Sequence, residues 1–397
     1  MSASGTLIGK EIVLAVTGSI AAVETVRLAH ELRRRGARVQ AVMSRAASGI
    51  IHPDALTYAT GRPAITAITG MVEHVTSCGE GGTADLLLIA PATANTLCKI
   101  AAGVDDTPVT TFATTAIGRG MPVVVAPAMH ESMYRHPGVA GCLSTLEGWG
   151  IVVAGPRIEE GKAKIAGISE IVLLCERELM GKPLLGRHVL ITSGPCREKV
   201  DDVRILTTRS RGLMGRALAM QAFRLGARVT VVHGDRFLGA ENVHAADART
   251  MHKEVCRICA DDPVDLFISA AAVSDFLPEP MAGKIPSGRP VTLTLNPLPK
   301  IIDDVVDRFH VPTIAFKLGD DAVARGRAML RDSIGLVVAN DPRVMGETDT
   351  CVTLLGGGGF MREASGSKEA VAAEILDCAL DIFQFSKRET KYSFPER

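Results

Sequence analysis

The sequence has 397 residues, of which 44 are basic and 44 acidic; 47% are hydrophobic and 4% aromatic. This length is too great for one ordinary domain and fits two of roughly 180–200 residues each. The balanced charge argues against a general nucleic-acid or anionic-membrane binder. The scarcity of aromatic side chains argues against a platform for stacking bases. A local basic cluster at a phosphate site is still compatible with this composition.

Nine cysteines are scattered without the rhythm of a disulfide scaffold. The first ten residues contain no apolar core of signal-peptide length, and no uncharged apolar run reaches about 18 residues. We therefore expect a protein of the reducing cytoplasm without a membrane span. The one CxxC pair, Cys256 and Cys259, lies in the helix-like run MHKEVCRICADD. A zinc site of this type needs a second pair, so we interpret these cysteines as helix residues without metal.

The first half begins with an apolar strand, IVLAV at 12–16, followed by a Thr-Gly-Ser turn. A helical pattern then runs through 23–36, and a second strand, ARVQAVMS, occupies 37–44. The order strand, turn, helix, strand predicts a parallel sheet covered by helices. Further apolar strands follow at 85–92, 122–129 and 150–156.

The second half repeats this order, with a strand at 188–195, a helix at 216–226 and a strand at 227–234. The turn-to-turn spacing is 18 residues from Gly18 to Gly36 but 32 from Gly194 to Gly226, so the second unit carries an insertion of about 14 residues. More strands follow at 265–272, 313–318 and 334–341, and GGGG at 356–359 predicts a turn between short strands. We predict an α/β protein with two doubly wound parallel-sheet, Rossmann-like domains at 1–182 and 183–397.

The turn at 17–19 lies between a strand and a helix, where backbone N–H groups bind phosphate and glycine permits close approach. Such a turn is also a common helix cap, so on its own it is weak evidence for a ligand site. Ser44 ends the next strand and can add a hydroxyl group. PATANT at 91–96 and PAMHESMY at 127–134 both follow apolar strands. We expect these two segments to lie side by side at one edge of the sheet.

The segments GSIAA, PATAN and PAM-x-x-x-M, in this order, resemble the homo-oligomeric flavin-containing cysteine decarboxylases, among them the phosphopantothenoylcysteine decarboxylases. The resemblance implies that Gly18 and Ser19 form the FMN phosphate loop. It implies that His74 is the active-site histidine, a base or an orienting group for the substrate thiol. His130 stands where other members carry the asparagine that holds the substrate carboxylate. The other implied flavin contacts are Ser44, Asn95, Thr110 and Thr111, with a turn-forming role as the alternative for Asn95.

In this family, FMN redox chemistry drives loss of the cysteinyl carboxylate. A late clamp in the family carries a cysteine that donates a proton, but the corresponding run here, RIEEGKAKIAGISE at 157–170, has none. The resemblance leaves Lys162 or Lys164 to bind the substrate phosphate or carboxylate. The proton donor stays unassigned, because Cys142 and Cys175 are better explained as packed core residues.

Six ordered segments of the second half, SAAAVSDF, GKIPSG, LNPLPKI, AFKL, RGRAMLRD and VVANDP, together resemble the phosphopantothenoylcysteine synthetases over about 190 residues. That family activates a pantothenate carboxylate with CTP and then transfers the acyl group to the cysteine amine. The resemblance implies that Lys284 is the essential lysine and Asp275 a nucleotide contact. Phe316, Arg327 and Arg331 fall near other nucleotide contacts. The spacing of the two arginines predicts that they share a helix face, with a solvated surface as the alternative.

The inserted loop departs from the family pattern Ser-Asn-x-Ser-Ser-Gly-Lys-Met-Gly, since this chain reads TTRSRGLMG at 207–215. Thr208 replaces the asparagine that stabilises the acyl nucleotide, and Leu213 replaces the lysine. Gly212 and the following Met-Gly pair are retained, which predicts the same backbone. A threonine cannot reproduce both hydrogen bonds of an amide. Arg209 or Arg211 can supply the lost positive charge.

The leading hypothesis is a fused enzyme that makes 4′-phosphopantetheine from 4′-phosphopantothenate and cysteine with FMN, CTP and Mg²⁺. Mg²⁺ is expected on the nucleotide phosphates, with its protein ligands and the choice of CTP over ATP left open. One alternative is an FMN-dependent decarboxylase whose inactive synthetase half is a binding or assembly module; another is a non-catalytic flavoprotein that regulates a partner. The resemblance implies a homo-oligomer of trimers and dimers, up to a dodecamer, that binds neither nucleic acid nor membrane.

Overall fold

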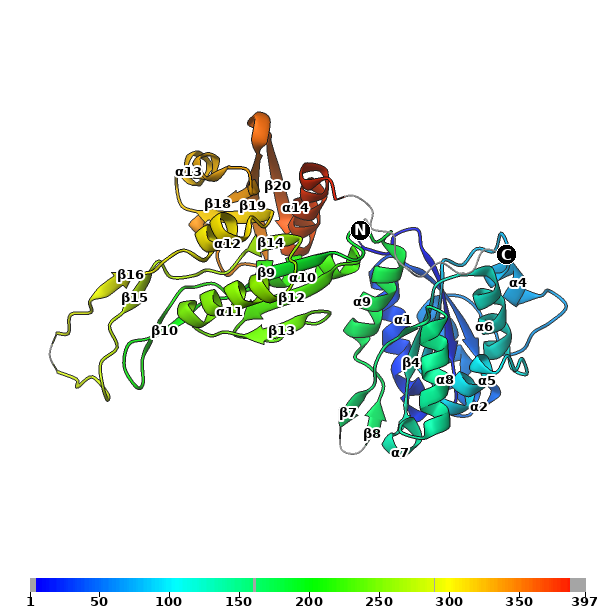
Figure 1. Ribbon diagram of the computed structural model, residues 1–397. Helices are drawn as coiled ribbons and strands as arrows, with labels where there is room; N and C mark the ends of the chain where they lie inside the picture. Colours follow the sequence, from blue (N-terminus) through cyan, green and yellow to red (C-terminus); the bar gives the residue numbers. More distant parts are fainter. Residues whose placement is uncertain (1–4, 160–161, 289, 386–397) are drawn as a thin grey trace. The chain divides into compact units, whose positions relative to one another are not determined.

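The computed structural model describes residues 5–159, 162–288 and 290–385 (Figure 1). These residues form two compact units, one ending at Gly181 and the other beginning at Lys182. Along the described residues, none of the helices combines the length and the apolar composition that a bilayer crossing requires.

The first unit is built on a five-stranded sheet in the order β2-β1-β3-β4-β6, and every neighbouring pair is parallel. The predicted parallel sheet of the first half is therefore confirmed. Its strands are β1 (Glu11–Val16), β2 (Arg38–Met43), β3 (Leu86–Ala92), β4 (Val123–Pro127) and β6 (Val152–Val153).

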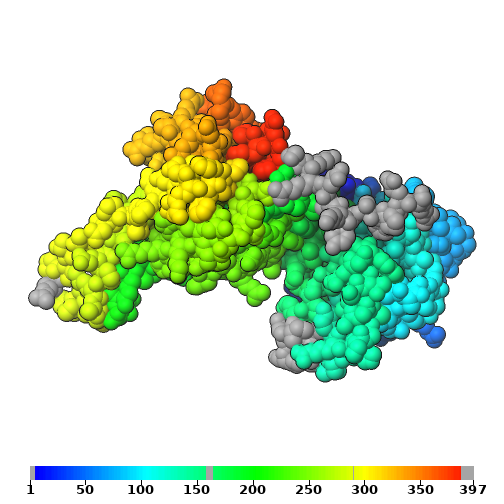
Figure 2. Space-filling model, viewed as in Figure 1, coloured from blue at the N-terminus to red at the C-terminus, as the bar shows by residue number. Residues whose placement is uncertain are grey.

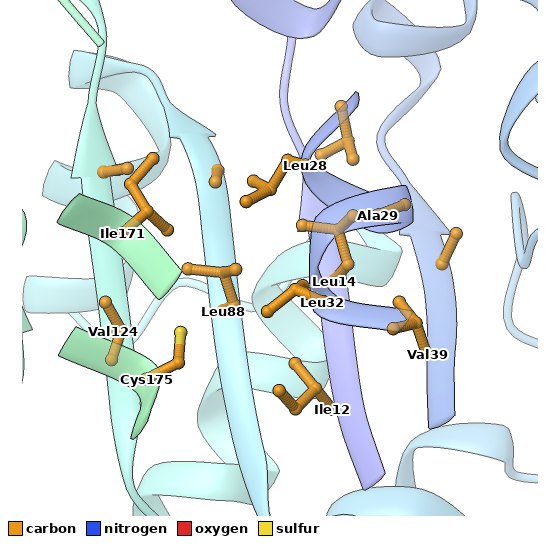
Figure 3. Packing of buried hydrophobic residues seen from close by; sticks show 14 of the residues in the cluster. Ile12, Leu14, Leu28, Ala29, Leu32, Val39, Leu88, Val124, Ile171 and Cys175 are labelled. Atoms are coloured by element: carbon orange, nitrogen blue, oxygen red, sulfur yellow. The ribbon is translucent and has the colours of Figure 1, made fainter. Parts of the chain in front are cut away.

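Helices cover both faces of this sheet. Because side chains alternate along a strand, Ile12 and Leu14 pack on one face while Val13 and Ala15 pack on the other. Figure 3 shows the first face, where α1 contributes Leu28 and α9 contributes Ile171 to a continuous apolar layer over β1, β3 and β4. This face is covered by α1 (Thr25–Arg34) and α9 (Ile168–Leu179), and the other by α5 (Ala94–Ala101), α6 (Pro108–Arg119) and α8 (Pro137–Gly148).

Short elements connect the strands and helices of the first unit, and α2, β5 and α7 lie at the carboxyl ends of the strands. The predicted helix after β1 starts as a 3-10 turn, η1 (Ile20–Glu24), before α1 begins. A small antiparallel sheet in the order β5-β8-β7 lies nearby. These elements are α2 (Arg45–Ser48), α3 (Pro53–Thr60), α4 (Glu73–Cys78), β5 (Met129–His130), α7 (Glu131–Tyr134), β7 (Arg157–Glu159) and β8 (Lys162–Lys164).

The second unit contains an eight-stranded sheet in the order β13-β12-β9-β14-β17-β18-β19-β20. The first six strands are parallel, but β19 and β20 pair antiparallel, so this sheet is mixed where a wholly parallel one was expected. The predicted turn at 356–359 joins the two antiparallel strands. The strands are β9 (His188–Thr192), β12 (Arg228–His233), β13 (Glu241–His244), β14 (Leu266–Ser269), β17 (Thr313–Leu318), β18 (Ile334–Asn340), β19 (Asp349–Gly356) and β20 (Met361–Ser367).

Helices again cover both faces of this second sheet. On β9, Val189 and Ile191 belong to one apolar cluster and Leu190 to another, which is the alternation of a strand buried on both sides. Helices α10 (Leu213–Arg224) and α14 (Lys368–Phe383) cover the first face, whereas α11 (Ala248–Asp261), α12 (Ile301–Phe309) and α13 (Ala322–Met329) contribute to the second.

The predicted insertion and a second loop form an arm, which we define as residues 197–207, 276–288 and 290–297. It contains the strand pair β10 (Arg197–Lys199) and β11 (Ile205–Thr207), and the pair β15 (Phe276–Pro278) and β16 (Leu295–Pro297). Figures 1 and 2 show the arm projecting from the body of the second unit. The Asp201 carboxylate joins its two parts, because it accepts hydrogen bonds from the backbone N–H groups of Val203 at 2.7 Å and Ile285 at 3.0 Å.

Candidate active sites

A pocket of about 820 Å³ lies where β1, β2, β3 and β4 end; we call it the first pocket. Five of the predicted flavin contacts line it, which are Gly18, Ser19, Ser44, Asn95 and Thr110. Met129 and Met133 of the PAMHESMY segment line it as well. The expected meeting of the PATANT and PAMHESMY segments at one sheet edge is therefore present in the structure, and the turn at 17–19 lines the same pocket.

The backbone of Gly18 forms the tightest part of the first pocket. A Cβ atom at this position would lie 2.4 Å from the Cβ of Ala46, so only glycine fits without a shift of α2. Thr17 ties the turn to the PATAN segment, because its hydroxyl donates to the carbonyl of Pro91 at 2.7 Å and accepts from the N–H of Thr93 at 3.0 Å. The N–H groups of Thr17 and Ser19 already donate to the carbonyls of Pro91 and Thr17, whereas Gly18 lets an anionic ligand approach the backbone closely.

The two predicted threonines on α6 have different roles. Thr110 lines the first pocket, and its hydroxyl completes the capping box of α6 with Thr107. Thr111 lies outside the lining, and its hydroxyl is hydrogen-bonded to the carboxylate of Asp105 and to the carbonyl of Thr107. Thr111 therefore acts within the segment before the helix rather than in the pocket.

His74 lies on α4, outside the lining of the first pocket of its own chain. Its Nδ1 atom is buried and has no hydrogen-bond partner within the described part of the chain. The ring meets Phe112 of α6 edge-on, with the ring centroids 6.4 Å apart. Val72 precedes it with φ of +47°, a left-handed conformation that is strained for a β-branched residue. Strain and an unpartnered ring nitrogen are both features of functional sites.

The predicted clamp run at 157–170 begins with a hairpin added to the PAMHESMY segment. Strand β8 pairs with β5, so that His130 lies opposite Lys162 in the backbone register. His130 is exposed, and its Nδ1 atom is 2.9 Å from the hydroxyl of Ser132. Lys164 follows in β8, outside the lining of the first pocket. The side chain of Lys162 lies outside the described part of the structure.

A second pocket, of about 650 Å³, lies at the carboxyl edge of β14, β17 and β18. Five of the predicted synthetase residues line it, which are Thr208, Gly212, Asp275, Phe316 and Arg331. The ends of parallel strands are where α/β sheets bind ligands, so both pockets have the position that the sequence predicts.

Glycines hold the loop at 207–215 against the sheet. Gly212 has φ of +67°, and a Cβ on Gly215 would lie 2.1 Å from the Oγ atom of Ser193. The retained glycines of the motif therefore have a steric reason. Thr208, which replaces the family asparagine, has a buried Oγ atom that finds no hydrogen-bond partner in the residues that the structure describes. A buried hydroxyl of this kind costs stability unless a ligand or water completes its hydrogen bonds.

The prediction that Arg327 and Arg331 share a helix face is wrong. Helix α13 ends at Met329, because Leu330 adopts an extended conformation and Arg331 forms a backbone bridge with Ile334. Arg327 is exposed, with an Nη atom 3.5 Å from the sulfur of Met361. Arg331 instead lines the second pocket, 3.1 Å from the carboxylate of Asp303.

Two further residues of the predicted set, Lys284 and Arg209, lie outside the lining of the second pocket. Lys284 lies in the arm, and Arg209 is an exposed loop residue outside the second pocket. Asn340 lines the pocket, whereas Asp341 caps the following turn. Hydrogen bonds from Arg343 lower the pKa of Asp341 to about 2.

Five cations among the described lining residues of the second pocket were not in the predicted set: Arg211 was considered only as a substitute charge, and Lys300, Lys317, Arg325 and Lys368 were missed. Lys300 and Lys317 stand inside the motifs LNPLPKI and AFKL, so their motifs gave a signal. Lys368 is the first residue of α14 and follows the helix cap Ser367. It belongs to no motif, and only the fold brings it to the pocket.

One cysteine of the CxxC pair on α11 lies close to His252 and Asp304, a grouping that the sequence did not reveal. Ligand atoms of His252, Cys256 and Asp304 lie within 4.8 Å of one another, whereas Cys259 stands outside this group. The Nε2 atom of His252 is 2.6 Å from the Asp304 carboxylate. The two groups therefore already satisfy each other as an ion pair when the histidine is protonated.

Two family models match the chain. Residues 1–180 match the model described as Flavoprotein, and residues 184–382 match the DNA/pantothenate metabolism flavoprotein C-terminal domain. The matched ranges correspond to the two units of the fold.

Curated relatives extend over both units. The chain is 44% identical over 362 residues to the coenzyme A biosynthesis bifunctional protein CoaBC of Thermococcus kodakarensis, covering 88% of this chain and 90% of that protein. It is 34% identical over 396 residues to the protein of the same name from Vibrio vulnificus, covering 94% and 97%. A solved C-terminal domain of CoaBC is 28% identical, with a TM-score of 0.44 over 51% of this chain and 98% of that one.

Proposed function

The chain belongs to the family of bifunctional coenzyme A biosynthesis proteins, and from that premise we propose how its two units divide the work. The second unit joins 4′-phosphopantothenate to cysteine with CTP through an acyl-cytidylate. The first unit then decarboxylates 4′-phosphopantothenoylcysteine to 4′-phosphopantetheine. The observation that carries this assignment is the presence of two separate pockets at sheet edges, each lined by its own family's motif residues.

The first pocket fits FMN. Gly18 presents its backbone to the phosphate without a side chain, and Ser19, Asn95 and Thr110 offer polar groups around it. FMN, when bound, supplies the reversible redox chemistry of the decarboxylation. The protein must hold the substrate carboxylate and orient its thiol, and we assign these roles to His130 and His74.

We infer that a second copy of the chain completes the first site. His74 lies outside the pocket of its own chain, and exposed apolar residues flank it, among them Met71, Val72 and Val75. Exposed apolar side chains of this kind mark contact surfaces. We therefore propose that trimers of the first unit share flavin sites between chains.

The second unit has its own exposed apolar surface, on the arm. Val203, Ile205 and Phe276 each expose about half or more of their surface. We propose that pairs of second units associate through the arm and that Lys284 acts from it. Trimers and dimers together give a dodecamer, and light scattering that finds a monomer would contradict this assembly.

The second pocket fits a nucleoside triphosphate and a second anion. Lys300, Lys317 and Lys368 bring positive charge to its edge, which phosphate groups and a developing acyl charge both require. Asp275 lines the same pocket, and we assign to it a contact with the nucleotide or with Mg²⁺, which we propose is held chiefly by the phosphates. Thr208 supplies one donor where the family asparagine supplies an amide.

We further propose 1–182 and 183–397 as the limits of the decarboxylase and ligase domains. We also propose that the protein is located in the cytoplasm. The nine free cysteines support this location, because thiols persist in a reducing compartment.

The test is mass spectrometry of the products formed by the purified full chain from 4′-phosphopantothenate, cysteine, Mg²⁺ and CTP. Formation of 4′-phosphopantetheine is the expected result, and ATP replaces CTP in a parallel reaction to establish the nucleotide. No product from this mixture, with decarboxylation of added 4′-phosphopantothenoylcysteine intact, would overturn the ligase assignment. That result favours an inactive second unit with a binding or assembly role, for which the altered loop at 207–215 is the motivating observation.

A further inference from the structure

One corner of the second pocket has the features of an anion site, and the proposed reaction does not yet assign a particular ligand group to it. Strand β19 runs antiparallel to β18, so its first residues lie at the same edge where β18 ends. Helix α14 starts at this edge too, directly after β20. Thr350 from β19 and Lys368 from α14 both line the pocket there.

Thr350 is a buried polar residue without a partner. The residue is only 6% exposed, and its Oγ atom has no hydrogen-bond partner among the described residues. Folded proteins rarely leave a buried hydroxyl unsatisfied, because the desolvated group then costs free energy. A threonine kept in this state at a pocket wall indicates a ligand that completes its hydrogen bonding.

Lys368 brings a positive charge to the same corner. It is the first residue of a 16-residue helix, whose amino end carries the positive pole of the helix dipole. Its backbone N–H donates to the carbonyl of Thr348 at 3.2 Å, which holds the start of α14 beside the start of β19. Burial lowers the pKa of Lys368, and the nearby Arg211 lowers it further, while Glu347 raises it.

Arg211 joins this corner to the glycine loop before α10. Its Nη1 atom is 3.4 Å from the carbonyl oxygen of Gly346, so the loop at 207–215 and the turn before β19 are in contact. Arg211 and Thr208 line the same pocket, and Thr208 also has an unpartnered buried hydroxyl. Two such hydroxyls and two cations therefore converge on one region, close to the amino end of α10, where the nucleotide phosphates are expected.

We propose that Thr350 and Lys368, with Arg211, form a subsite for a terminal phosphate group. This inference rests on the proposed ligase function and adds to it residues of β19 and α14 as contacts for one phosphate group. Two substrates carry such a group: the nucleoside triphosphate and 4′-phosphopantothenate. The chemistry of recognition is the same for both, so the experiment distinguishes them.

The experiment is calorimetric titration of the full chain with CTP, CMP, 4′-phosphopantothenate and pantothenate. The variants are Lys368→Met and Thr350→Val, which keep side-chain size while removing the charge or the hydroxyl. Lys253→Met on the exposed face of α11 and Thr353→Val, further along β19 and outside the pocket lining, are the matched controls. Loss of one charged hydrogen bond is expected to weaken binding by about 10- to 100-fold.

If the subsite holds the nucleotide's terminal phosphate, Lys368→Met weakens the binding of CTP and leaves the binding of CMP and of 4′-phosphopantothenate unchanged. If it holds the other substrate, the variant weakens 4′-phosphopantothenate and leaves pantothenate and CTP unchanged. Lys368→Arg and Thr350→Ser are expected to restore most of the affinity. Unchanged binding of all four ligands by both variants would overturn the subsite alone, whereas a wild-type chain that binds none of them would overturn the ligase function as well.

A merely structural role for Thr350 is excluded by a second readout. Thr350→Val removes an unpartnered buried hydroxyl, so the ligand-free variant is expected to melt at the same or a higher temperature than the wild type. The rise in melting temperature on adding the ligand is expected to shrink. A lower melting temperature without ligand, with an undiminished ligand-induced rise, would instead show that the hydroxyl supports the fold.

Discussion

The Cα atom of Gly215 packs directly against the side chain of Ser193: a Cβ added at this glycine would lie 2.1 Å from the Ser193 Oγ atom and 2.5 Å from its Cβ. Ser193 follows β9 and Gly215 lies in the first turn of α10, so this contact sets how closely the helix approaches the strand end. The distance between these two residues therefore decides the position of the loop that lines the second pocket.

Replacing Gly215 with alanine is expected to push α10 away from β9. Overpacking of a buried contact costs about 1–3 kcal/mol, and the displaced loop should weaken CTP binding as well. Thermal melting and calorimetric titration of Gly215→Ala check both effects. Gly141→Ala is the control, because this helical glycine has open space around its Cβ position and should gain slightly in stability. An unchanged Gly215→Ala chain would show that the close contact has no role.

Replacing Gly18 with alanine is expected to abolish FMN retention. The added methyl would lie 2.4 Å from the Ala46 Cβ, which forces apart the turn and the start of α2. Flavin absorbance per chain after gel filtration measures the loss. Gly118→Ala, at an exposed helical glycine with nothing within 4 Å, should keep full flavin content. Full flavin retention by Gly18→Ala would place the phosphate elsewhere.

Replacing His74 with glutamine removes the buried, unpartnered Nδ1 atom. If His74 orients or deprotonates the thiol, decarboxylation should fall about 10²- to 10⁴-fold, while FMN content and CTP-dependent ligation stay unchanged. His52→Gln, at an exposed helix-capping histidine, is the control. Both activities are measured on the same preparations, so a general folding defect would appear as a parallel loss in the two. Full decarboxylase activity would remove His74 from the mechanism.

Replacing Asp201 with asparagine is expected to loosen the arm. The two carboxylate oxygens of Asp201 accept hydrogen bonds from backbone N–H groups in both parts of the arm. An asparagine would turn its own NH₂ group toward the N–H groups of one part, so that the hydrogen bonds to that part are lost. The Ile285 hydrogen bond is the largest cause that holds the pKa of Asp201 below its usual range, so the link should survive mild acidification. Tryptic cleavage after Lys284, followed by mass spectrometry, should accelerate about tenfold. Asp261→Asn, which removes an exposed carboxylate of α11 outside the arm, should cleave like the wild type.

Alkaline pH is expected to weaken ligand binding at the Lys368 corner earlier than for an ordinary lysine. Its pKa is lowered by burial, so its charge is lost as the pH rises through a value below the ordinary ~10.4. The dissociation constant of the ligand that Lys368 binds, followed upward from neutral pH, should increase in this window. Lys368→Arg should flatten the profile, because a guanidinium stays charged. The same slope in both proteins would assign the titration to another group.

The strand and helix patterns were sufficient for the first sheet, because each strand there is a short apolar run between clear turns. They were insufficient for the edge of the second sheet. β20 reads MREASGS, which has little apolar character, and only its pairing with β19 makes it a strand. Its antiparallel direction follows from a tight turn, a feature that a strand-helix alternation does not contain.

The candidate sites were predictable where a motif ends a strand. Gly18, Asn95, Thr208 and Asp275 are of this kind, and all four line a pocket. The arginines of RGRAMLRD were misplaced because nothing in the run marks the end of α13 at Met329.

Lys368 was missed for a related reason. It lies 160 residues along the chain from Thr208, and the fold alone brings the two residues to one pocket. Residues gathered by topology rather than by motif are the part of a site that a single sequence does not reveal.

The two pockets share no lining residue, and each belongs to its own unit with its own apolar core. A molecule made in one pocket must therefore leave it before it can enter the other. Joining the two catalysts in one chain sets their ratio at one to one in every assembly, whatever the level of synthesis. The capacities to supply and to consume the acylated cysteine then rise and fall together with the amount of this one chain.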